Sequence, residues 1–428
     1  MAETLGKLAT DLGERSTYDA ASQCSRCGYC EQSCPTYRLT GDEKKSPRGR
    51  NQLVRLLLEN KLPDPGAAAE ALETCLLCSA CTTTCYAHVP TADIVLEGRR
   101  MLAERRPWAA RALSYLLLER TAWFELLLKG ANLAKRLGLS RLSRPLLRAA
   151  GLSGLAEADE HVTLAPLRFS HELLDISAAR RKSPATLQFQ PCGTRYLFTG
   201  VARATQRALG PDSAPLESGC CGLLAYNYGE LSDAREFARR VIAAAGISGA
   251  ERKSPDVVVD CSSCAAFLKT YPQLFLSDPE WKPRAEAFAK RVKDAVEVFN
   301  VPAKWRGQTT ATYHESCRAC HGQGLKTPAA LMGSCGGYRP LPEKDSCCGG
   351  AGAFAFTQPE LSDEVLRKKI ANIAQTGASV VVTSSTSCLI QLARGLRKYY
   401  PSCEVRHISE IAAFSDGEAQ ASGSPSPR

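Results

Sequence analysis

The sequence predicts an α+β fold, in which an all-helical N-terminal domain is followed by a helical linker and two tandem small α/β domains. Three observations lead to this prediction. Two cysteine runs with the same spacing lie within the first 85 residues, a basic segment follows them, and the second half of the chain repeats its own order of elements. We expect the domains to span residues 1–98, 99–183, 184–310 and 311–414, with a disordered tail at 415–428.

The first cysteine run reads Cys24-Ser-Arg-Cys27-Gly-Tyr-Cys30-Glu-Gln-Ser-Cys34-Pro35, and the second run has the same spacing. This spacing is typical of chains that hold a [4Fe–4S] cubane by four thiolates, the arrangement of bacterial ferredoxins. A pair of zinc sites or a disulfide framework is the alternative, but zinc motifs seldom carry a third C-x₂ step followed by x₃-Cys-Pro. In two-cluster proteins the fourth cysteine of each run ligates the other cluster. We therefore expect one cubane on Cys24, Cys27, Cys30 and Cys85, and another on Cys75, Cys78, Cys81 and Cys34.

Helices are expected around these two clusters. Residues 1–23 are predicted to form a polar helical lead-in. Ser46 fits an N-cap and Pro47 the first position of a helix that ends near Asn60, and the alanine-rich residues 66–74 lead helically into the second run. The apolar core of this domain is small, so we expect the metal centres to supply much of its folding energy.

The composition is that of an ordinary soluble globular protein, with 44% hydrophobic and 23% charged residues. Cysteines ordered into metal-binding runs, 20 cysteines in all, favour a cytoplasmic protein over a secreted one. Neither a signal peptide nor a transmembrane helix is expected, because no apolar stretch is long enough. We expect no nucleic-acid partner. No Ser/His/Asp arrangement or phosphate-binding loop indicates hydride or acyl chemistry within the chain.

Most of the net charge of +10 is concentrated in residues 99–150, where twelve cationic and three acidic residues give +9. Leucines and aromatic residues alternate there with arginines and lysines at roughly helical spacing. Two interpretations stay open. The segment forms packing helices whose cations are solvated or meet an acidic partner subunit, or it forms an amphipathic surface that lies on an anionic membrane, peripherally on the inner face. Residues 151–183 are interpreted as a loosely structured linker.

From residue 184 the chain contains two copies of one pattern. Each copy has, in order, a cysteine after an apolar stretch, a Cys-Cys-Gly sequence, the same Leu-Ser-Asp, a helix that ends at a glycine, and a Val-Val-Val strand. The first copy then ends in Cys261-Ser-Ser-Cys264 and the second in Ser385-Thr-Ser-Cys388. This order indicates a duplication, and strands that alternate with helices predict two small α/β units. The cysteines of the first copy are Cys192, Cys220, Cys221, Cys261 and Cys264, and those of the second are Cys317, Cys347, Cys348 and Cys388.

The two copies differ in the number of thiolates they offer. Five thiolates in the first copy exceed the need of one tetrahedral zinc or one cubane, and suit a cluster with an extra bridging thiolate. Ser385 stands in the second copy where Cys261 stands in the first, which leaves four thiolates for a cubane or a structural zinc. We expect the first copy to transfer electrons to a substrate and the second to act as a relay or scaffold.

Further cysteines and histidines have less certain roles. Cys320 and Cys335 are possible substitute ligands in the second copy, within which residues 333–337 are interpreted as an inserted loop, and Cys403 is expected to be an inert buried thiol. Three roles are open for His314: a metal ligand, a hydrogen-bond donor to cluster sulfur, or a structural residue. The same alternatives apply to His321.

The sequence resembles the iron–sulfur subunit of glycolate oxidase and its relatives in lactate utilisation and heterodisulfide reduction, the cysteine-rich CCG-domain proteins. The resemblance runs in one collinear order over about residues 18–413. It is carried by the segment from Cys34-Pro-Thr-Tyr-Arg to Ser-Pro-Arg-Gly-Arg50, by Cys75-Leu-Leu-Cys-Ser-Ala-Cys81, Tyr313-His-Glu-Ser-Cys317, Cys347-Cys-Gly-Gly-Ala-Gly352 and Thr376-Gly-Ala-Ser-Val-Val-Val382.

The resemblance implies an oxidoreductase subunit for electron transfer. A partner subunit binds FAD and oxidises a 2-hydroxy acid such as glycolate or lactate, and electrons then pass through the two cubanes and the CCG centres to a quinone or another carrier. The five-cysteine set of the first copy is similar to that of heterodisulfide reductase, where it holds a noncubane [4Fe–4S] pair. This likeness implies an alternative function, reduction of a disulfide at such a cluster. A third, non-catalytic alternative is a scaffold whose CCG copies hold zinc or no metal.

Overall fold

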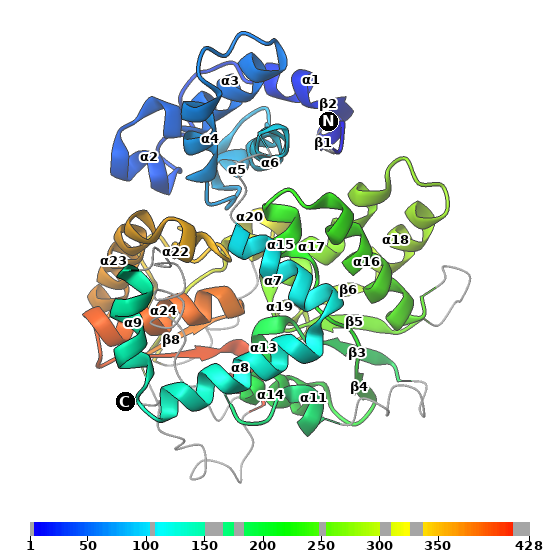
Figure 1. The fold of residues 1–428 in the computed structure, drawn as a ribbon, viewed down its shortest axis with the longest axis vertical. Helices are drawn as coiled ribbons and strands as arrows, with labels where there is room; N and C mark the ends of the chain where they lie inside the picture. Colours follow the sequence, from blue (N-terminus) through cyan, green and yellow to red (C-terminus); the bar gives the residue numbers. More distant parts are fainter. Residues whose placement is uncertain are drawn as a thin grey trace.

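The structure, a computed structural model, describes residues 4–102, 108–149, 166–174, 184–247, 254–299, 310–325 and 337–413. An N-terminal domain lies across the top of two neighbouring α/β units, which correspond to the two copies of the repeat (Figure 1). The predicted α+β class is confirmed. The predicted domain limits stay predictions, and the limit at residue 98 falls inside a helix that continues to Met101.

The N-terminal domain begins with a β-hairpin, so the prediction of an entirely helical domain with a helical lead-in is wrong at this point. Strand β1 (Lys7–Thr10) pairs antiparallel with β2 (Gly13–Ser16), and helix α1 (Thr17–Ser22) follows. Gly13 has a φ of +87°, which is unfavourable for residues that carry a side chain. The Thr10 hydroxyl donates a hydrogen bond to the Gly13 carbonyl at 2.8 Å. This tight turn, together with burial of Leu8, favours strand pairing over a first helix.

The remainder of the N-terminal domain is helical, as predicted. Ser46 caps the long helix by accepting a hydrogen bond from the Gly49 amide at 2.9 Å, and Pro47 occupies its first position. Val54 on this helix packs beneath Gly98, where a Cβ would lie 2.7 Å from its side chain. The helices are α2 (Pro35–Thr40), the 3₁₀ turn η1 (Glu43–Lys45), α3 (Pro47–Leu58), α4 (Pro65–Glu73), α5 (Ala80–Thr84) and α6 (Thr91–Met101).

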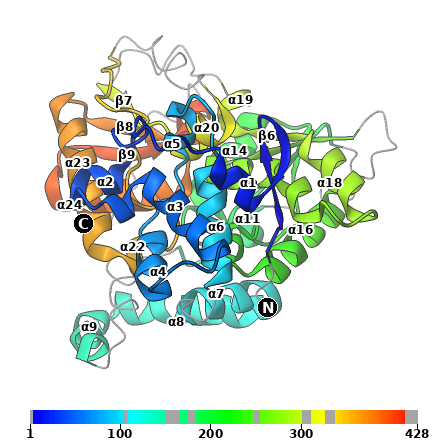
Figure 2. The ribbon, with the colours of Figure 1, turned by 90° about the horizontal axis from the view of Figure 1, so that it is seen from above.

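The basic segment forms three helices, α7 (Trp108–Glu119), α8 (Thr121–Arg136) and α9 (Ser140–Ala149). They lie along one edge of the molecule when it is seen from above (Figure 2). Within the described ranges, no helix combines the length and the apolar character needed to cross a membrane. Of the predicted linker, only residues 166–174 are described, and they include the short helix α11 (Ser170–Leu173).

The first repeat is built on a parallel sheet in the order β4–β3–β5–β6. Its strands are β3 (Thr186–Phe189), β4 (Ser213–Pro215), β5 (Asp256–Val259) and β6 (Val292–Asp294). Its helices are α13 (Cys192–Tyr196), α14 (Thr199–Leu209), α15 (Leu223–Asn227), α16 (Leu231–Ala245), α17 (Ser262–Lys269), η3 (Tyr271–Phe275), α18 (Trp281–Ala289) and α19 (Ala295–Val298). The expected helix does end at Gly246, in a left-handed C-cap.

The second repeat has a parallel sheet in the order β7–β8–β9, formed by β7 (Ala311–Tyr313), β8 (Val380–Thr383) and β9 (Glu404–His407). Its helices are α20 (Cys317–Gln323), α22 (Phe354–Thr357), α23 (Pro359–Gln375), α24 (Thr386–Tyr399) and α25 (Ile408–Ala412). The predicted insertion around Cys335 and the predicted tail lie outside the described residues, apart from Gly337.

The two repeats meet at equivalent loops. The Ser262 amide donates to the Ser384 carbonyl at 2.9 Å, and the Ser262 hydroxyl donates to the Ser384 hydroxyl at 2.7 Å. Helix α14 of the first repeat packs on α25 of the second, where Thr205 donates to Ser409 at 2.8 Å. Because these loops follow β5 and β8, the carboxyl ends of the two sheets are brought close together.

Candidate metal centres

Four cysteines of the N-terminal domain line one cavity, and we call them the inner set: Cys34, Cys75, Cys78 and Cys81. They come from both runs, in the combination that the crossing rule predicts. Burial raises the pKa of the Cys81 thiol, and the neighbouring thiols of Cys75 and Cys34 raise it further. Four thiols that line one cavity, with Cys34 and Cys78 buried, are a donor set that fits an iron–sulfur cluster.

The remaining four cysteines of the runs form the outer set: Cys24, Cys27, Cys30 and Cys85. Burial raises the pKa of Cys30 to about 11, with contributions from the nearby thiols of Cys24, Cys85 and Cys27. Cys27 is exposed, and next to this set the rings of Tyr29 and Tyr86 lie 5.4 Å apart with 57% and 87% of their surfaces exposed. The outer set therefore lies close to the protein surface.

Both runs wrap their thiols by the same backbone device. The residues on either side of the second cysteine have left-handed φ angles, +60° and +83° at Arg26 and Gly28, and +52° and +63° at Leu77 and Ser79. Left-handed backbone at non-glycine residues is uncommon and clusters at functional sites. Its repetition at equivalent positions indicates that the backbone is shaped around a group at each site.

Arg50 supplies a buried cation beside the inner set. It is 1% exposed, donates to the Ala71 carbonyl at 2.9 Å, and points Nη1 at the Cys34 sulfur across 3.8 Å. Its Nη2 donates to the hydroxyls of Thr36 and Thr74. A fixed positive charge offsets the negative charge of thiolates in a low-dielectric site. Arg50 ends one of the motifs that carry the family resemblance, but its role is not evident from the sequence.

The five thiols of the first repeat converge at the carboxyl end of its sheet, and we call them the repeat-1 set. Cys192 begins α13 directly after β3, and Cys261 caps α17 directly after β5. Ligands of parallel α/β sheets bind at this edge. The sulfurs of Cys221 and Cys264 are 3.3 Å apart, and hydrogen bonds with Cys220 and Cys264 lower the pKa of Cys221 to about 6.

A left-handed glycine follows the cysteine pair in each repeat. Gly222 has a φ of +83°, and a Cβ there would approach the Phe237 side chain to 2.8 Å. Gly349 has a φ of +84°, and a Cβ there would lie 2.7 Å from the Ser362 carbonyl oxygen. Each glycine amide donates to the first sulfur of its pair at 3.4 Å. The backbone therefore turns directly after the cysteine pair, at the same place in both copies.

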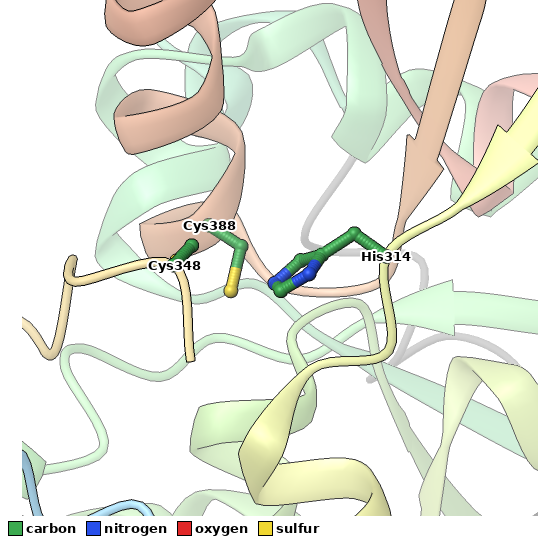
Figure 3. A group of neighbouring side chains, drawn as sticks. All are labelled: His314, Cys348 and Cys388. Carbon is green, nitrogen blue, oxygen red and sulfur yellow. The ribbon is translucent and has the colours of Figure 1, made fainter. Parts of the chain in front are cut away.

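The second repeat brings its four thiols together in the same manner, and we call them the repeat-2 set: Cys317, Cys347, Cys348 and Cys388. A hydrogen bond with Cys347, followed by burial, raises the pKa of Cys317. Cys348 lies between Cys347 and Cys388. The buried imidazole of His314 lies beside this set, with its ligand atoms and the sulfurs of Cys348 and Cys388 all within 4.8 Å of one another (Figure 3).

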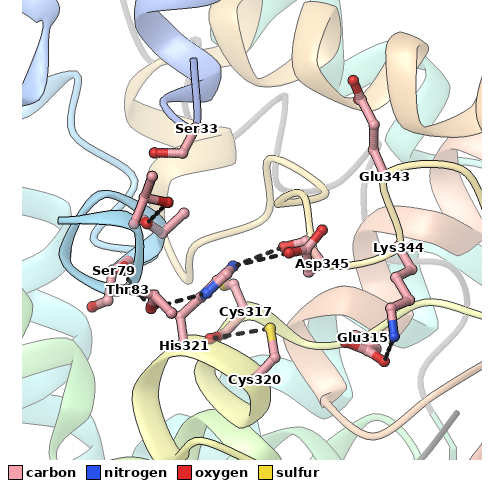
Figure 4. Close-up of polar contacts among 12 residues, drawn as sticks. Ser33, Ser79, Thr83, Glu315, Cys317, Cys320, His321, Glu343, Lys344 and Asp345 are labelled. Atoms are coloured by element: carbon pink, nitrogen blue, oxygen red, sulfur yellow. Dashed lines mark hydrogen bonds and ion pairs between the residues drawn. The ribbon is translucent and has the colours of Figure 1, made fainter. Parts of the chain in front are cut away.

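The inner set and the repeat-2 set are neighbours across the junction between domains. Cys78, Leu76 and Cys347 belong to one buried apolar cluster, against which Cys317 packs. Around it His321 contacts the Thr83 hydroxyl at 3.1 Å and the Asp345 carbonyl at 3.3 Å (Figure 4). No feature of the local sequence indicates this contact, because it joins segments far apart in the chain.

The other candidate residues are not part of these sets. The Cys320 thiol donates to the Ser316 carbonyl at 3.3 Å. Cys403 is buried in the core of the second repeat, where burial raises its pKa to about 11. His321 is bonded at the junction described above. Cys335 lies outside the described residues.

A domain with two cysteine sets joined to two cysteine-rich α/β repeats defines an iron–sulfur electron-transfer protein. The family model for a 4Fe-4S dicluster domain matches residues 20–89, and the model for a cysteine-rich domain matches residues 186–269 and 311–393. The chain is 28% identical over 433 residues to the probable glycolate oxidase iron-sulfur subunit of Bacillus subtilis, covering 95% of this chain and 96% of that protein.

Two further relatives agree. Lactate utilization protein A of an Exiguobacterium species is 33% identical over 252 residues, which are 56% of this chain and 100% of that protein. The glycolate oxidase iron-sulfur subunit of Escherichia coli is 29% identical over 404 residues, or 91% and 92% of the two chains. The chain belongs to the family of iron–sulfur proteins that contains the glycolate oxidase iron-sulfur subunits and the lactate utilization proteins A.

Proposed function

We propose that this chain is the electron-transfer subunit of a 2-hydroxy-acid oxidoreductase. A partner subunit binds FAD and oxidises an acid of the glycolate or lactate type, and this chain carries the electrons to a quinone. The substrate class is inferred from the relatives, two of which are named as glycolate oxidase subunits and a third for lactate utilization. Iron–sulfur clusters, held by the four thiol sets, supply one-electron carriers when bound.

The order of the thiol sets supports a single route through the chain. The outer set lies near the surface beside Tyr29 and Tyr86, which makes it the entry point for electrons from a partner. The inner set follows, since Cys30 contributes to the raised pKa of Cys81. Cys78 and Cys347 share one buried apolar cluster, which joins the inner set to the repeat-2 set, and this shared cluster is the observation that carries the proposal.

The repeat-2 set leads to the repeat-1 set through the loops where the repeats meet. Ser385, at the N-terminus of α24, lies 3.5 Å from the Cys261 sulfur. The second repeat therefore acts as the relay, and the first repeat delivers electrons to the acceptor. This assignment makes Cys192, Cys220, Cys221, Cys261 and Cys264 the set closest to the final electron transfer.

Helix α8 supports a membrane quinone as the acceptor. Its Phe124 packs on Tyr196 with ring centroids 5.0 Å apart, and Tyr196 ends the short helix that begins with Cys192. The outer face of the same helix is apolar. Its large exposed apolar residues recur at helical spacing and are 57–67% exposed: Trp123, Leu126, Leu127 and Leu133, with Leu137 at the C-cap.

We propose that this face lies on an anionic membrane surface. An exposed apolar stripe marks an interaction site, and tryptophan and leucine flanked by cations are the composition of helices that lie in the membrane interface. Arg120 and Arg136 lie at the two ends of α8 and are exposed, and the wider segment carries nine net positive charges. The membrane would thereby bring a lipid-dissolved quinone close to the repeat-1 set.

Affinity purification of the tagged chain from its native host tests the proposed function. We expect a flavoprotein to copurify, with bound FAD, and the complex to reduce a soluble quinone analogue when glycolate or lactate is added. In Cys348→Ala, flavin reduction by the acid should persist while quinone reduction is lost. A complex without flavin that instead reduces a disulfide would contradict the proposal and favour the heterodisulfide reductase-like alternative.

A further inference from the structure

The ring of His314 is buried and has no hydrogen-bond partner in the described part of the chain. Its side chain has no exposed surface, and among the described residues neither ring nitrogen has a partner. A buried polar group left unsatisfied destabilises the folded state. Such a cost is retained in a native structure when the group serves a bound ligand or the chemistry of a site.

The ring is turned toward the thiols of the second repeat. His314 follows β7, and its amide donates to the Val382 carbonyl at 2.9 Å, which fixes the backbone at the carboxyl end of the sheet. From there the imidazole faces Cys348 and Cys388, and the three ligand atoms lie within 4.8 Å of one another (Figure 3). This separation is compatible with atoms that share one metal centre.

The equivalent position in the first repeat is apolar. Phe189 lies three residues before Cys192, as His314 lies three residues before Cys317. Phe189 pairs with Val259, which lies two residues before Cys261. In the second repeat Tyr313 pairs with Val382, so the next residue, His314, lies beside Thr383, which is two residues before Ser385. The first repeat thus has a phenylalanine and a fifth thiol, whereas the second has a histidine and a serine.

Ser385 does not replace the missing thiol within its own repeat. Its hydroxyl contacts the hydroxyls of Ser263 at 3.0 Å and Ser387 at 3.1 Å, and lies 3.5 Å from the sulfur of Cys261 in the other repeat. The second repeat therefore loses one donor at this position and gains one at His314. The number of donors, five, is the same in both repeats.

We propose that His314 is an iron ligand in the second repeat, where its imidazole completes a five-donor set with Cys317, Cys347, Cys348 and Cys388. This proposal rests on the proposed function only in taking the bound group to be an iron–sulfur cluster. Imidazole in place of thiolate removes one negative charge, and histidine ligation raises the reduction potential of iron–sulfur centres. The second repeat is thereby tuned to accept electrons from the inner set.

Pulsed EPR on the full-length protein, purified anaerobically and poised at a series of potentials, tests this ligand. We expect ¹⁴N hyperfine coupling from a coordinated imidazole, and we expect the coupling to change to that of ¹⁵N when histidine is labelled. Four thiolates per cubane predict no such coupling from the outer or inner set. The wild-type measurement needs no substitution, so it is decisive even if variants fail to fold.

Two variants identify the residue. In His314→Cys the nitrogen coupling should disappear, iron per chain should be unchanged, and the midpoint potential of one centre should fall. His321→Gln is the matched control, because His321 is also near the repeat-2 set but has partners of its own, and it should retain the coupling. Three outcomes would each overturn the proposal. They are the absence of nitrogen coupling at every potential, survival of the coupling in His314→Cys, and stoichiometric zinc that is lost in His314→Cys. Copurification of a flavoprotein would be unaffected by these outcomes, so failure here is distinct from failure of the proposed function.

Discussion

The Thr386 hydroxyl donates a hydrogen bond to the Cys261 sulfur across 3.3 Å, although the two residues belong to different repeats. Thr386 is the first residue of α24 and Cys261 is the N-cap of α17. Hydrogen bonds with Cys264, Ser385 and Thr386 hold the pKa of Cys261 well below its ordinary value, against the effect of burial. The second repeat therefore contributes directly to the environment of a thiol in the first.

Removal of this hydrogen bond should lower the reduction potential of the repeat-1 centre. A donor to a ligating sulfur stabilises the reduced and more negative state, and one hydrogen bond of about 1 kcal/mol corresponds to about 40 mV for one electron. In Thr386→Val the shape is kept and the donor is lost. Redox titration followed by EPR should show a fall of this order in one centre only.

Thr386→Ser is the matched control, because it keeps the hydroxyl and should keep the potential. A Cβ on Gly193 would lie 2.6 Å from the Thr386 side chain, so this side chain packs closely against Gly193. The test variant therefore needs a β-branched residue of the same shape at position 386. Equal potentials in the valine and serine variants would refute a role for this hydrogen bond.

Cys27→Ser should remove one centre of the N-terminal domain and leave the other. Cys27 belongs to the outer set and is exposed, so its replacement disturbs no core packing. We expect a loss of about four irons per chain and of one EPR signal in the reduced protein. Cys403→Ala, outside all four sets, should leave iron content unchanged. Zinc rather than iron lost from Cys27→Ser would show that the N-terminal domain is not a dicluster domain.

Much of this architecture could be predicted because cluster ligands occur at fixed spacings. The two cysteine runs and the repeated Cys-Cys-Gly sequences each specify local backbone geometry, so both α/β units were recognisable. The hairpin at residues 7–16 was not, because its strands are four residues long and largely polar, and their pairing depends on the left-handed turn at Gly13.

The relations between the sets could not be predicted. The buried cluster that Cys78 shares with Cys347 and the hydrogen bond from Thr386 to Cys261 join residues distant in sequence, and no periodicity or spacing encodes them. The role of His314 stays open between several alternatives in the sequence, because the sequence alone does not reveal that both ring nitrogens are buried without a partner among the described residues. Such contacts and burial depend on how distant parts of the chain pack together.

The apolar face of α8 should bind vesicles that contain anionic lipid. Transfer of exposed leucine or tryptophan side chains from water accounts for about 1.5–3 kcal/mol each when burial is complete, so Trp123→Ser with Leu127→Ser should weaken binding by at least about tenfold. Binding of the wild type should also weaken as salt screens the cations of the segment. Vesicle flotation measures both effects.

Leu12→Ser is a suitable control for this experiment. Leu12 is 66% exposed, similar to the α8 residues, but it lies in the turn between β1 and β2. These strands belong to the N-terminal domain at the top of Figure 1, whereas α8 lies in the lower half of that view. It should leave vesicle binding unchanged. If the α8 variant binds vesicles normally but loses its partner subunit, the face is a protein interface and not a membrane-binding surface.

His407 should make the second repeat less stable in mild acid. The ring is fully buried, accepts a hydrogen bond from the Ser409 amide at 3.2 Å through Nδ1, and burial lowers its pKa to about 4. A histidine with a lowered folded-state pKa contributes stability above its unfolded pKa of about 6.5, and this contribution is lost as pH falls from about 6.5 toward 4. Between pH 7 and 5.5 the expected loss is about 1 kcal/mol.

His407→Asn isolates this effect from the acid sensitivity of the metal centres. Asparagine is a good N-cap, so it can preserve the start of α25 while it removes the titrating ring. Urea unfolding of both proteins at pH 7 and pH 5.5 should show that the variant loses about 1 kcal/mol less than the wild type over this interval. Acid release of bound metal is common to both proteins and cancels in the comparison. The same pH dependence in both would mean that His407 is not protonated on unfolding in this range, contrary to the prediction from its burial.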